Sequence, residues 1–458
     1  MRANESEPLW AWPALCAAVG LPERTGPDVR GVSIDSRLLQ AGDLFVALNG
    51  ERDGNLFAAG AVQAGAAGVL VSRAGDYVAP ALVVDDTLTA LQAIAAASRT
   101  RTAAQVVAIT GSSGKTTLKT MLAYAWQAHA TEGNLNNHLG VPLTLARMPA
   151  SARHAVIEIG TNHPGEIEPL SRLARPNVAV LLNVLPAHIG NFDGMSGLRT
   201  EKLSIAAGLV EGGIFVMPTE LRAAFKGAAR VLTFGMDAAS DVRLQFRAPG
   251  STLAEGAHIE FGGRAWQLSV PGGGEHRALS CAAACAVAIA LAVGTGEALS
   301  DAGANALKGF IERLGQSQVP VGRGNVTQVR EFTIIDDSYN ANPASMGYAL
   351  RVLAQRPGRR QALLGDMLEL GEHEQAMHAG LLPDCAGIER IHCVGPRMLA
   401  LYERLPDWQR GEYLPEPDSC TAERVAGWLL PGDTLMVKGS KMMFWHRNLV
   451  RNLLAVLG

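Results

Sequence analysis

Short runs of β-branched and apolar residues alternate, in the middle of the chain, with stretches whose apolar residues recur at helical spacing. Val106–Thr110, Ala155–Ile159 and Val178–Val184 have the length and composition of buried strands. Leu118–His129 follows the first of them with the periodicity of a helix that buries one face. Strands that alternate with helices are typical of a parallel sheet covered by helices. We therefore predict an α/β protein with a central, doubly wound, mostly parallel sheet.

The same alternation recurs on both sides of this central region. The predicted strands are Val32–Ile34, Leu44–Leu48, Gly68–Val71 and Leu82–Val84 on the N-terminal side, and Phe332–Ile335, Ala362–Leu364, Arg390–Val394 and Thr434–Val437 on the C-terminal side. A chain of 458 residues exceeds one ordinary core and is expected to form about three domains. We place them at residues 1–100, a small α/β domain, at 101–314, the central domain, and at 315–458, a Rossmann-like α/β domain.

The composition is that of a folded, soluble protein, because 48% of the residues are hydrophobic and 18% are charged. A formal net charge of −3 lacks the basic excess that nucleic-acid binding requires, so small molecules are the expected partners. The uncharged stretch 278–296 is mostly alanine with serine, glycine and threonine inside it. This composition favours a buried helix over a membrane span. We expect a monomer that binds neither nucleic acid nor membrane.

Cysteine usage and the N-terminus bear on the compartment. The six cysteines are scattered without a Cys-x-x-Cys motif, and no histidine joins them at metal-ligand spacing. We predict reduced, buried thiols. The first residues include Glu5 and Glu7 and lack the apolar run of a signal peptide. The expected location is the cytoplasm.

A glycine-rich loop joins the first central strand to its helix, and it consists of Gly111, Ser112, Ser113, Gly114, Lys115, Thr116 and Thr117. Backbone N–H groups in such a loop and the N-terminus of the next helix converge on one point, which suits phosphate. Lys115 is placed to reach the β/γ-phosphates, and a threonine hydroxyl to bind Mg²⁺. Ile109 stands where the general pattern has a further glycine, so the loop is a shortened variant. An ordinary turn with a surface lysine is the alternative, but the strand–helix context favours ATP.

Polar side chains also follow the neighbouring central strands. Glu158 lies at the end of one strand, and His188 follows another. Ligands of doubly wound sheets bind beyond the carboxyl ends of the strands. We therefore predict that Glu158 and His188 meet above the phosphate loop and hold a cation, although each residue alone is more often structural. The C-terminal strands end in polar groups too, at 336–343, 365–367 and 438–441, which predicts a site facing the central domain.

The N-terminal region has one candidate site. Ser36 and Arg37 end a strand, and a guanidinium beside a hydroxyl suits a diphosphate. A surface ion pair between Asp35 and Arg37 is the simpler alternative.

These segments together resemble the Mur ligases, the ATP-dependent amide-bond-forming enzymes of peptidoglycan precursor synthesis. TGSSGKTT is similar to the short phosphate loop of that family. The branch that adds D-alanyl-D-alanine is matched by NLNNHLGVPLTL, EIGTNHPGEIEPL, the AH of LPAHIGNF, DDSYNANPASM, LLGDMLELG and VKGSK. The N-terminal DSR, GDLFVAL and GERDG resemble its uridine-nucleotide domain. The resemblance covers nearly the whole chain.

The resemblance implies an activity: ligation of D-alanyl-D-alanine to UDP-N-acetylmuramoyl-tripeptide through an acyl phosphate, with ATP and Mg²⁺. Such a ligase acts in cell-wall biogenesis, and so in cell shape, cell division and the cell cycle. Gly111–Thr117 would hold the ATP phosphates, with Lys115 on the terminal ones and Thr116 on Mg²⁺. Glu158 and His188 would bind magnesium.

The remaining implied roles lie outside the loop. Lys202 stands where related enzymes carry a carbamylated lysine that supports a second Mg²⁺, and with Lys115, Glu158 and His188 it completes the implied catalytic set. Contacts to ATP from the C-terminal domain are implied for Arg323, Asp337 and Asn340, and contacts to the uridine nucleotide for Ser36 and Arg37. The chain departs from the family at Arg277 and Ser280, where asparagines are usual, so the resemblance assigns no adenine contact there.

Two other interpretations stay open. The first is a related ligase that adds a single amino acid, or a folate polyglutamylating enzyme on the same scaffold, and DSYNANP and GDMLELG argue against both. The second is an ATPase switch that controls a partner, for which the sequence offers no partner surface.

Overall fold

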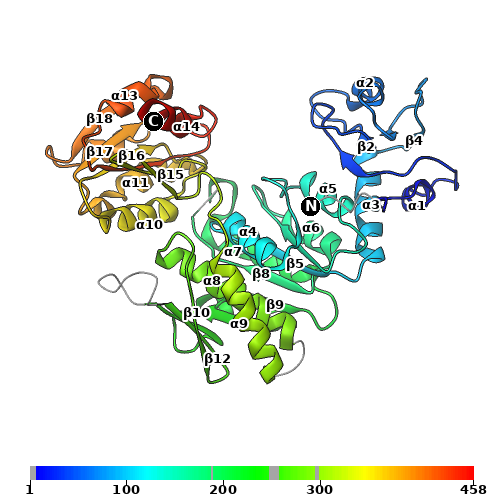
Figure 1. The fold of residues 1–458 in the computed structure, drawn as a ribbon, viewed down its shortest axis with the longest axis horizontal. Helices are drawn as coiled ribbons and strands as arrows, with labels where there is room; N and C mark the ends of the chain where they lie inside the picture. Colours follow the sequence, from blue (N-terminus) through cyan, green and yellow to red (C-terminus); the bar gives the residue numbers. More distant parts are fainter. Residues whose placement is uncertain (1–6, 187–188, 247–256, 294–298) are drawn as a thin grey trace.

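The computed structural model describes residues 7–186, 189–246, 257–293 and 299–458. Three sheets follow one another along the chain: one of four strands, one of nine and one of six. The N-terminal and C-terminal sheets lie at opposite ends of the molecule, with the central sheet between them (Figure 1). This is the α/β architecture that the alternating pattern predicts.

The N-terminal sheet is entirely parallel, in the order β1-β2-β3-β4. Its strands are β1 (Gly31–Ser33), β2 (Asp43–Val46), β3 (Gly68–Val71) and β4 (Ala81–Val83), and its helices are α1 (Trp12–Ala18), α2 (Ala58–Gln63) and α3 (Thr87–Arg101). α3 also packs against α5 (Gly140–Ala146) of the central region. Leu143 and Ala146 of α5 belong to the same apolar cluster as Leu91 and Ile94 of α3. The two regions therefore share a continuous core.

The central sheet has the order β13-β12-β11-β10-β9-β8-β5-β7-β6. Its strands are β5 (Gln105–Thr110), β6 (His129–Ala130), β7 (His154–Glu158), β8 (Val178–Leu181), β9 (Ile214–Pro218), β10 (Arg230–Gly235), β11 (Val242–Phe246), β12 (Ala257–Phe261) and β13 (Arg264–Gln267). They are parallel up to β11, and β11-β12-β13 run antiparallel. Alternate residues of β5 enter different apolar clusters, Val107 and Ile109 on one face and Val106 and Ala108 on the other. The sheet is therefore doubly wound.

One face of this sheet is covered by α4 (Lys115–Trp126), α8 (Glu275–Val293) and α9 (Asp301–Gly315), and the other by α5, α6 (Ile167–Ala174) and the segment after α7 (Gly194–Leu203). Within the described residues, α8 is the one helix long and apolar enough to cross a membrane. It lies beside α9 on one face of the central sheet (Figure 1) and packs against α4, α9 and the central strands. Most of its residues are buried. This is the predicted buried helix.

The C-terminal sheet has the order β14-β15-β19-β16-β17-β18. Its strands are β14 (Asn325–Val329), β15 (Phe332–Asp337), β16 (Arg360–Gly365), β17 (Arg390–Val394), β18 (Arg410–Leu414) and β19 (Thr434–Lys438). All neighbours are parallel except β14 and β15. One face carries α10 (Pro343–Ala354), α11 (Glu374–Ala379) and α12 (Leu399–Tyr402), and the other α13 (Ala422–Ala426) and α14 (Leu449–Leu457).

Candidate active site

The phosphate loop is the turn between β5 and α4. Gly114 is the N-cap of α4 and has a φ of +82°, a conformation that glycine adopts without strain. No side chain caps this helix, and the first N–H groups of any helix have no partner within it. The helix begins at Lys115, three residues before the predicted start, because the loop glycine ends the turn. The N-terminus of α4 thus presents free donors to an anion.

Asn183, just after β8, holds the loop from the neighbouring strand. Its Oδ1 accepts hydrogen bonds from the backbone N–H groups of Ser112 and Ser113, both at 3.0 Å, and its Nδ2 donates to the Ser113 carbonyl at 3.1 Å. The Ser112 hydroxyl donates to the Leu185 carbonyl at 2.8 Å. Sequence analysis did not single out Asn183. The signal that could have found it is an amide side chain directly after a buried strand.

Lys115 lies across the loop, with Nζ donating to the Gly111 carbonyl at 2.7 Å. Burial lowers the pKa of this lysine, the nearby Glu158 carboxylate raises it, and the guanidinium of Arg323 lowers it further. A lysine so placed gains stabilisation when an anion joins it.

Glu158 ends β7 and is 2% exposed. Its Oε1 accepts hydrogen bonds from Asn136 Nδ2 at 2.8 Å and from Thr116 Oγ1 at 3.4 Å. Lys119 Nζ lies 3.1 Å from Oε2 as an ion pair, but Oε2 accepts no hydrogen bond of good geometry. Burial alone would raise the pKa of Glu158, but Lys119, Lys115 and Asn136 hold it below its ordinary value. The carboxylate is therefore ionised at neutral pH.

This donor set suits a hard cation. The hydroxyl of Thr116 and the incompletely bonded carboxylate of Glu158 are oxygen ligands of the kind that Mg²⁺ prefers. Among the described residues no group of three His, Cys, Asp or Glu side chains could hold a metal ion. A magnesium ion here would therefore take further ligands from phosphate and water, as is usual at nucleotide sites. Ala187 and His188 lie outside the described residues.

A cleft of about 840 Å³ joins the phosphate loop to the C-terminal strand ends. Arg323, Asp337 and Asn340 line it together with Lys115, Thr116 and Glu158. Arg323 Nη2 donates to Thr116 Oγ1 at 3.2 Å, and its guanidinium lies 4.2 Å over the Tyr339 ring. The residues predicted to approach the phosphate loop from the C-terminal domain thus lie on the same cleft.

Asp337 and Asn340 are held by a lysine that sequence analysis did not assign. Lys438, at the end of β19, forms an ion pair with Asp337 at 2.7 Å and donates to the Asn340 carbonyl at 3.1 Å. Its side chain is 3% exposed. β15 and β19 are parallel neighbours, and their register places Asp337 opposite Lys438. This pairing depends on strand order, which no local pattern reveals.

Lys202 lies on α7 and is buried, with 4% of its surface exposed. Burial lowers its pKa from 10.5 to about 7, the charge of Lys115 lowers it too, and Glu201 raises it. Lysines on helices are usually solvated, but this one is buried. Near neutral pH a substantial fraction of this amine is uncharged.

Replacing Lys202 by methionine is expected to make the free energy of unfolding less dependent on pH. Between pH 7 and 10.5 the unfolded chain binds a proton at Lys202 that the folded chain holds more weakly. The contribution of Lys202 to the stability of the wild type therefore falls as the pH drops through this window, and it levels off below it. The stability of Lys202→Met relative to wild type should rise by up to about 1.4 kcal/mol for each pH unit lowered. Urea unfolding of both proteins in CO₂-free buffer at several pH values measures this difference in the free energy of unfolding. A difference that does not change with pH would contradict the prediction.

Ser36 and Arg37 do not line the cleft. They lie in the turn after β1, where Arg37 is 86% exposed on its side chain and pairs with Asp35 at 2.6 Å. This is the surface ion pair that sequence analysis named as the simpler alternative. The pair holds the pKa of Asp35 at about 2, chiefly through the side-chain hydrogen bond from Arg37.

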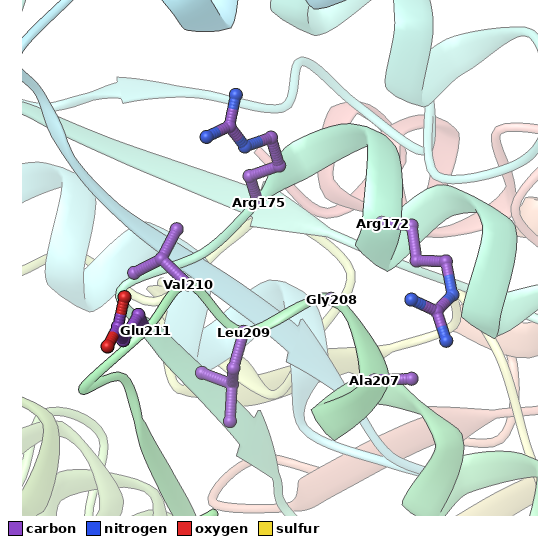
Figure 2. A pocket seen from close by; sticks show the side chains of 7 residues that line it. All are labelled: Arg172, Arg175, Ala207, Gly208, Leu209, Val210 and Glu211. Carbon is purple, nitrogen blue, oxygen red and sulfur yellow. The ribbon is translucent and has the colours of Figure 1, made fainter.

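A second, shallow pocket of about 330 Å³ lies between α6 and the segment 207–211. Figure 2 shows the side chains of Arg172 and Arg175 on it pointing in different directions. Arg172 pairs with Glu168 at 2.8 Å. No set of functional groups converges here.

Three family models match successive parts of the chain. They are described as the Mur ligase family catalytic domain (residues 28–113), the Mur ligase middle domain (109–288) and the Mur ligase glutamate ligase domain (322–441). The UDP-N-acetylmuramoyl-tripeptide–D-alanyl-D-alanine ligase of Escherichia coli is 36% identical over 83% of this chain and 84% of its own length.

Comparison with solved structures indicates the same family. A MurF structure from Acinetobacter baumannii has a TM-score of 0.82 and 30% identity, covering 98% of this chain and 100% of that one. The MurF ligase from Thermotoga maritima, solved in complex with ADP, has a TM-score of 0.78 and 26% identity over 94% and 98%. The match in sequence and fold spans all three sheets and the cleft. The chain belongs to the Mur ligase family, in the branch of the UDP-N-acetylmuramoyl-tripeptide–D-alanyl-D-alanine ligases.

Proposed function

We propose that this protein joins D-alanyl-D-alanine to UDP-N-acetylmuramoyl-tripeptide at the expense of ATP, giving the UDP-N-acetylmuramoyl-pentapeptide precursor of peptidoglycan. One observation carries the proposal: the phosphate loop and the C-terminal residues Arg323, Asp337 and Asn340 line one cleft. Relatives that span most of the chain carry the name of this ligase. A site between two domains suits an enzyme that must bring three substrates together.

The phosphate loop supplies the groups that the first half-reaction needs. A substrate carboxylate oxygen attacks the γ-phosphorus of ATP, the bond to the bridging oxygen breaks, and ADP leaves. Negative charge collects on the transferring phosphoryl group, and Lys115 and the N-terminus of α4 are placed to offset it. Arg323 adds a second cation next to Thr116. The product is an acyl phosphate, which activates the carboxyl carbon.

In the second half-reaction the amine of D-alanyl-D-alanine attacks the acyl carbon. The carbon–oxygen bond to phosphate breaks, inorganic phosphate leaves, and the nitrogen loses a proton to become an amide. Water must be excluded, because it would hydrolyse the acyl phosphate. The position of the cleft between domains supports closure of the site when the substrates are bound.

We assign Mg²⁺ to Thr116 and Glu158, with His188 as a further ligand and Lys202 as the support of a second ion once carbamylated. The ion would neutralise phosphate charge. The lowered pKa of Lys202, about 7, supports carbamylation, since the uncharged amine is the form that adds CO₂. The carbamate would turn a buried cation into an anion beside Lys115, an electrostatic gain.

The remaining assignments concern the whole chain. We place domain boundaries near residues 100 and 314, close to the ends of α3 and α9. The N-terminal domain would hold the uridine nucleotide through Ser36 and Arg37, provided that Arg37 exchanges Asp35 for a diphosphate. We further assign the protein to the cytoplasm as a monomer.

The purified protein is expected to release phosphate from Mg-ATP only when UDP-N-acetylmuramoyl-tripeptide and D-alanyl-D-alanine are both present. Phosphate release and the mass of the pentapeptide product measure it, with omission of each substrate as the control. Turnover with a single amino acid would instead indicate a related ligase or a folate polyglutamylating enzyme. Phosphate release from ATP alone would indicate an ATPase and would overturn the proposal.

A further inference from the structure

Arg277, on the first turn of α8, is a buried cation that binds main-chain carbonyls. It is 6% exposed, and all of its side-chain hydrogen bonds within the described residues go to main-chain carbonyls. Its Nη1 donates to the Gly272 carbonyl at 2.6 Å, and its Nη2 donates to the Arg323 carbonyl at 2.8 Å. Longer contacts reach the carbonyls of Gly273 and Gly324, both at 3.3 Å. One guanidinium thus bridges two turns of the chain.

The two turns belong to different parts of the molecule. Gly272 lies in the turn that leads into α8 of the central region, whereas Arg323 and Gly324 directly precede β14 of the C-terminal sheet. Gly324 has a φ of +86°, and a Cβ there would lie 2.2 Å from Arg277 Nη2. Only glycine therefore permits the guanidinium to approach so closely. The arrangement requires this residue pair.

The bridged turn is also tied to the C-terminal strands. The Gly324 N–H donates to the Asp336 carbonyl at 2.6 Å, and the Tyr339 N–H donates to the Gly322 carbonyl at 3.0 Å. The turn is therefore tied to β15, which ends at Asp337, and to the following loop that carries Asn340. Arg277 holds it from the central side.

The side chain of Arg323 connects the turn that Arg277 holds to the phosphate loop. Its guanidinium packs on Tyr339 and reaches Thr116 Oγ1 at 3.2 Å, while its own carbonyl accepts the bond from Arg277. We propose that Arg277 is a positioning residue that fixes the main chain of Arg323 relative to the phosphate loop. Charge-assisted bonds from a planar guanidinium to two turns give this position both energy and direction.

The proposal rests on the proposed function for its kinetic readout. Arg277→Ala would remove the donor from the carbonyls of two turns, one of them the buried carbonyl of Gly324. The turn that carries Arg323 would be released, so Arg323 would approach the phosphates less often in its productive position. We expect kcat to fall about 10- to 100-fold. Because Arg277 acts through Arg323, its removal should matter only while the Arg323 side chain is present.

A double-mutant cycle tests this dependence. Steady-state kinetics are measured for wild type, Arg277→Ala, Arg323→Ala and the double variant, and the double variant is expected to match Arg323→Ala within about 2-fold. Arg277→Lys keeps a cation but cannot bridge both turns, so its kcat should lie between those of wild type and Arg277→Ala. If Arg277→Ala does not fold, Arg277→Lys takes its place in the cycle. Arg313, which donates to the Ala125 carbonyl at 2.8 Å on the far helix α9, is the matched control, and Arg313→Ala should keep wild-type kcat.

If the fold-losses of kcat in the two single variants multiply in the double variant, Arg277 acts independently of Arg323, and the inference is overturned. An equal loss of kcat in Arg313→Ala would overturn it too. If wild type does not ligate, the proposed function fails, and the same cycle is then measured on the Kd for ATP by calorimetry. Non-additive Kd values would support the positioning role, and additive ones would overturn it.

Discussion

Replacing Lys115 by alanine is expected to lower kcat about 1000-fold while leaving the fold intact. The ammonium group lies on the phosphate loop, bonded to the Gly111 carbonyl, and no other lysine is bonded to this loop in the described residues. Its contribution grows as charge develops on the transferring phosphoryl group, so its loss falls on kcat more than on the KM for ATP. Phosphate release under saturating substrates measures the effect.

Thermal unfolding of Lys115→Ala should show no loss of stability, because the wild-type lysine is held by one carbonyl and its pKa is lowered by burial. Lys308→Ala is the matched control, since Lys308 is exposed on α9, and it should keep wild-type activity. Activity of Lys115→Ala within a few-fold of wild type would contradict the assigned role.

Glu158→Gln is expected to remove both activity and stability. The wild-type carboxylate is ionised, accepts from Asn136, and faces Lys119, whose side chain is 6% exposed. The amide keeps the shape but leaves Lys119 with only the Gly133 carbonyl, at 2.8 Å. Breaking a buried pair from one side costs about 3–5 kcal/mol, and the amide's own hydrogen bonds should place this variant at the lower end. Loss of the charge should also lower kcat about 100-fold and shift the Mg²⁺ requirement upward.

Urea unfolding and activity measured across a Mg²⁺ titration report these two effects separately. Glu168→Gln is the matched control, because Glu168 pairs with Arg172 on the exposed surface of α6 and such pairs contribute about 0–1 kcal/mol. A Glu158→Gln protein with wild-type activity at low Mg²⁺ would contradict the metal assignment. Unchanged stability would contradict the buried ion pair.

Most of the strands predicted from the sequence are buried, although the partly exposed edge strand β4 was predicted too. β3 and β17 were predicted at their observed bounds, and β5, β7 and β19 within one residue, because a buried parallel strand is a continuous apolar run. β14, at a sheet edge, has a mostly exposed pattern and was not predicted. β11 and β18, likewise partly exposed, were also missed. Their pairing depends on neighbours that a local window does not contain.

The residues of the candidate site also fall into those that a local sequence pattern predicts and those that it does not. Strand ends can be located from the order of apolar and polar residues along the chain, and they lie next to the loop glycines, Lys115 and Glu158. Asn183 contacts the loop across some 70 residues of chain, and Lys438 contacts Asp337 across 101. Sequence analysis treated Arg277 only as a departure from the family pattern, whereas the structure shows it bound to the carbonyls of a turn 46 residues away.

By itself, the sequence determined the fold class, the phosphate loop and the family, because each depends on residues adjacent in the chain or on motifs that local backbone geometry demands. Only the tertiary structure decided which of these groups meet. Sheet order placed Lys438 opposite Asp337, domain packing brought Arg323 to Thr116, and burial lowered the pKa of Lys202. The physical reason is that a buried polar group must find its partner in three dimensions, and the distance along the chain does not restrict where that partner lies.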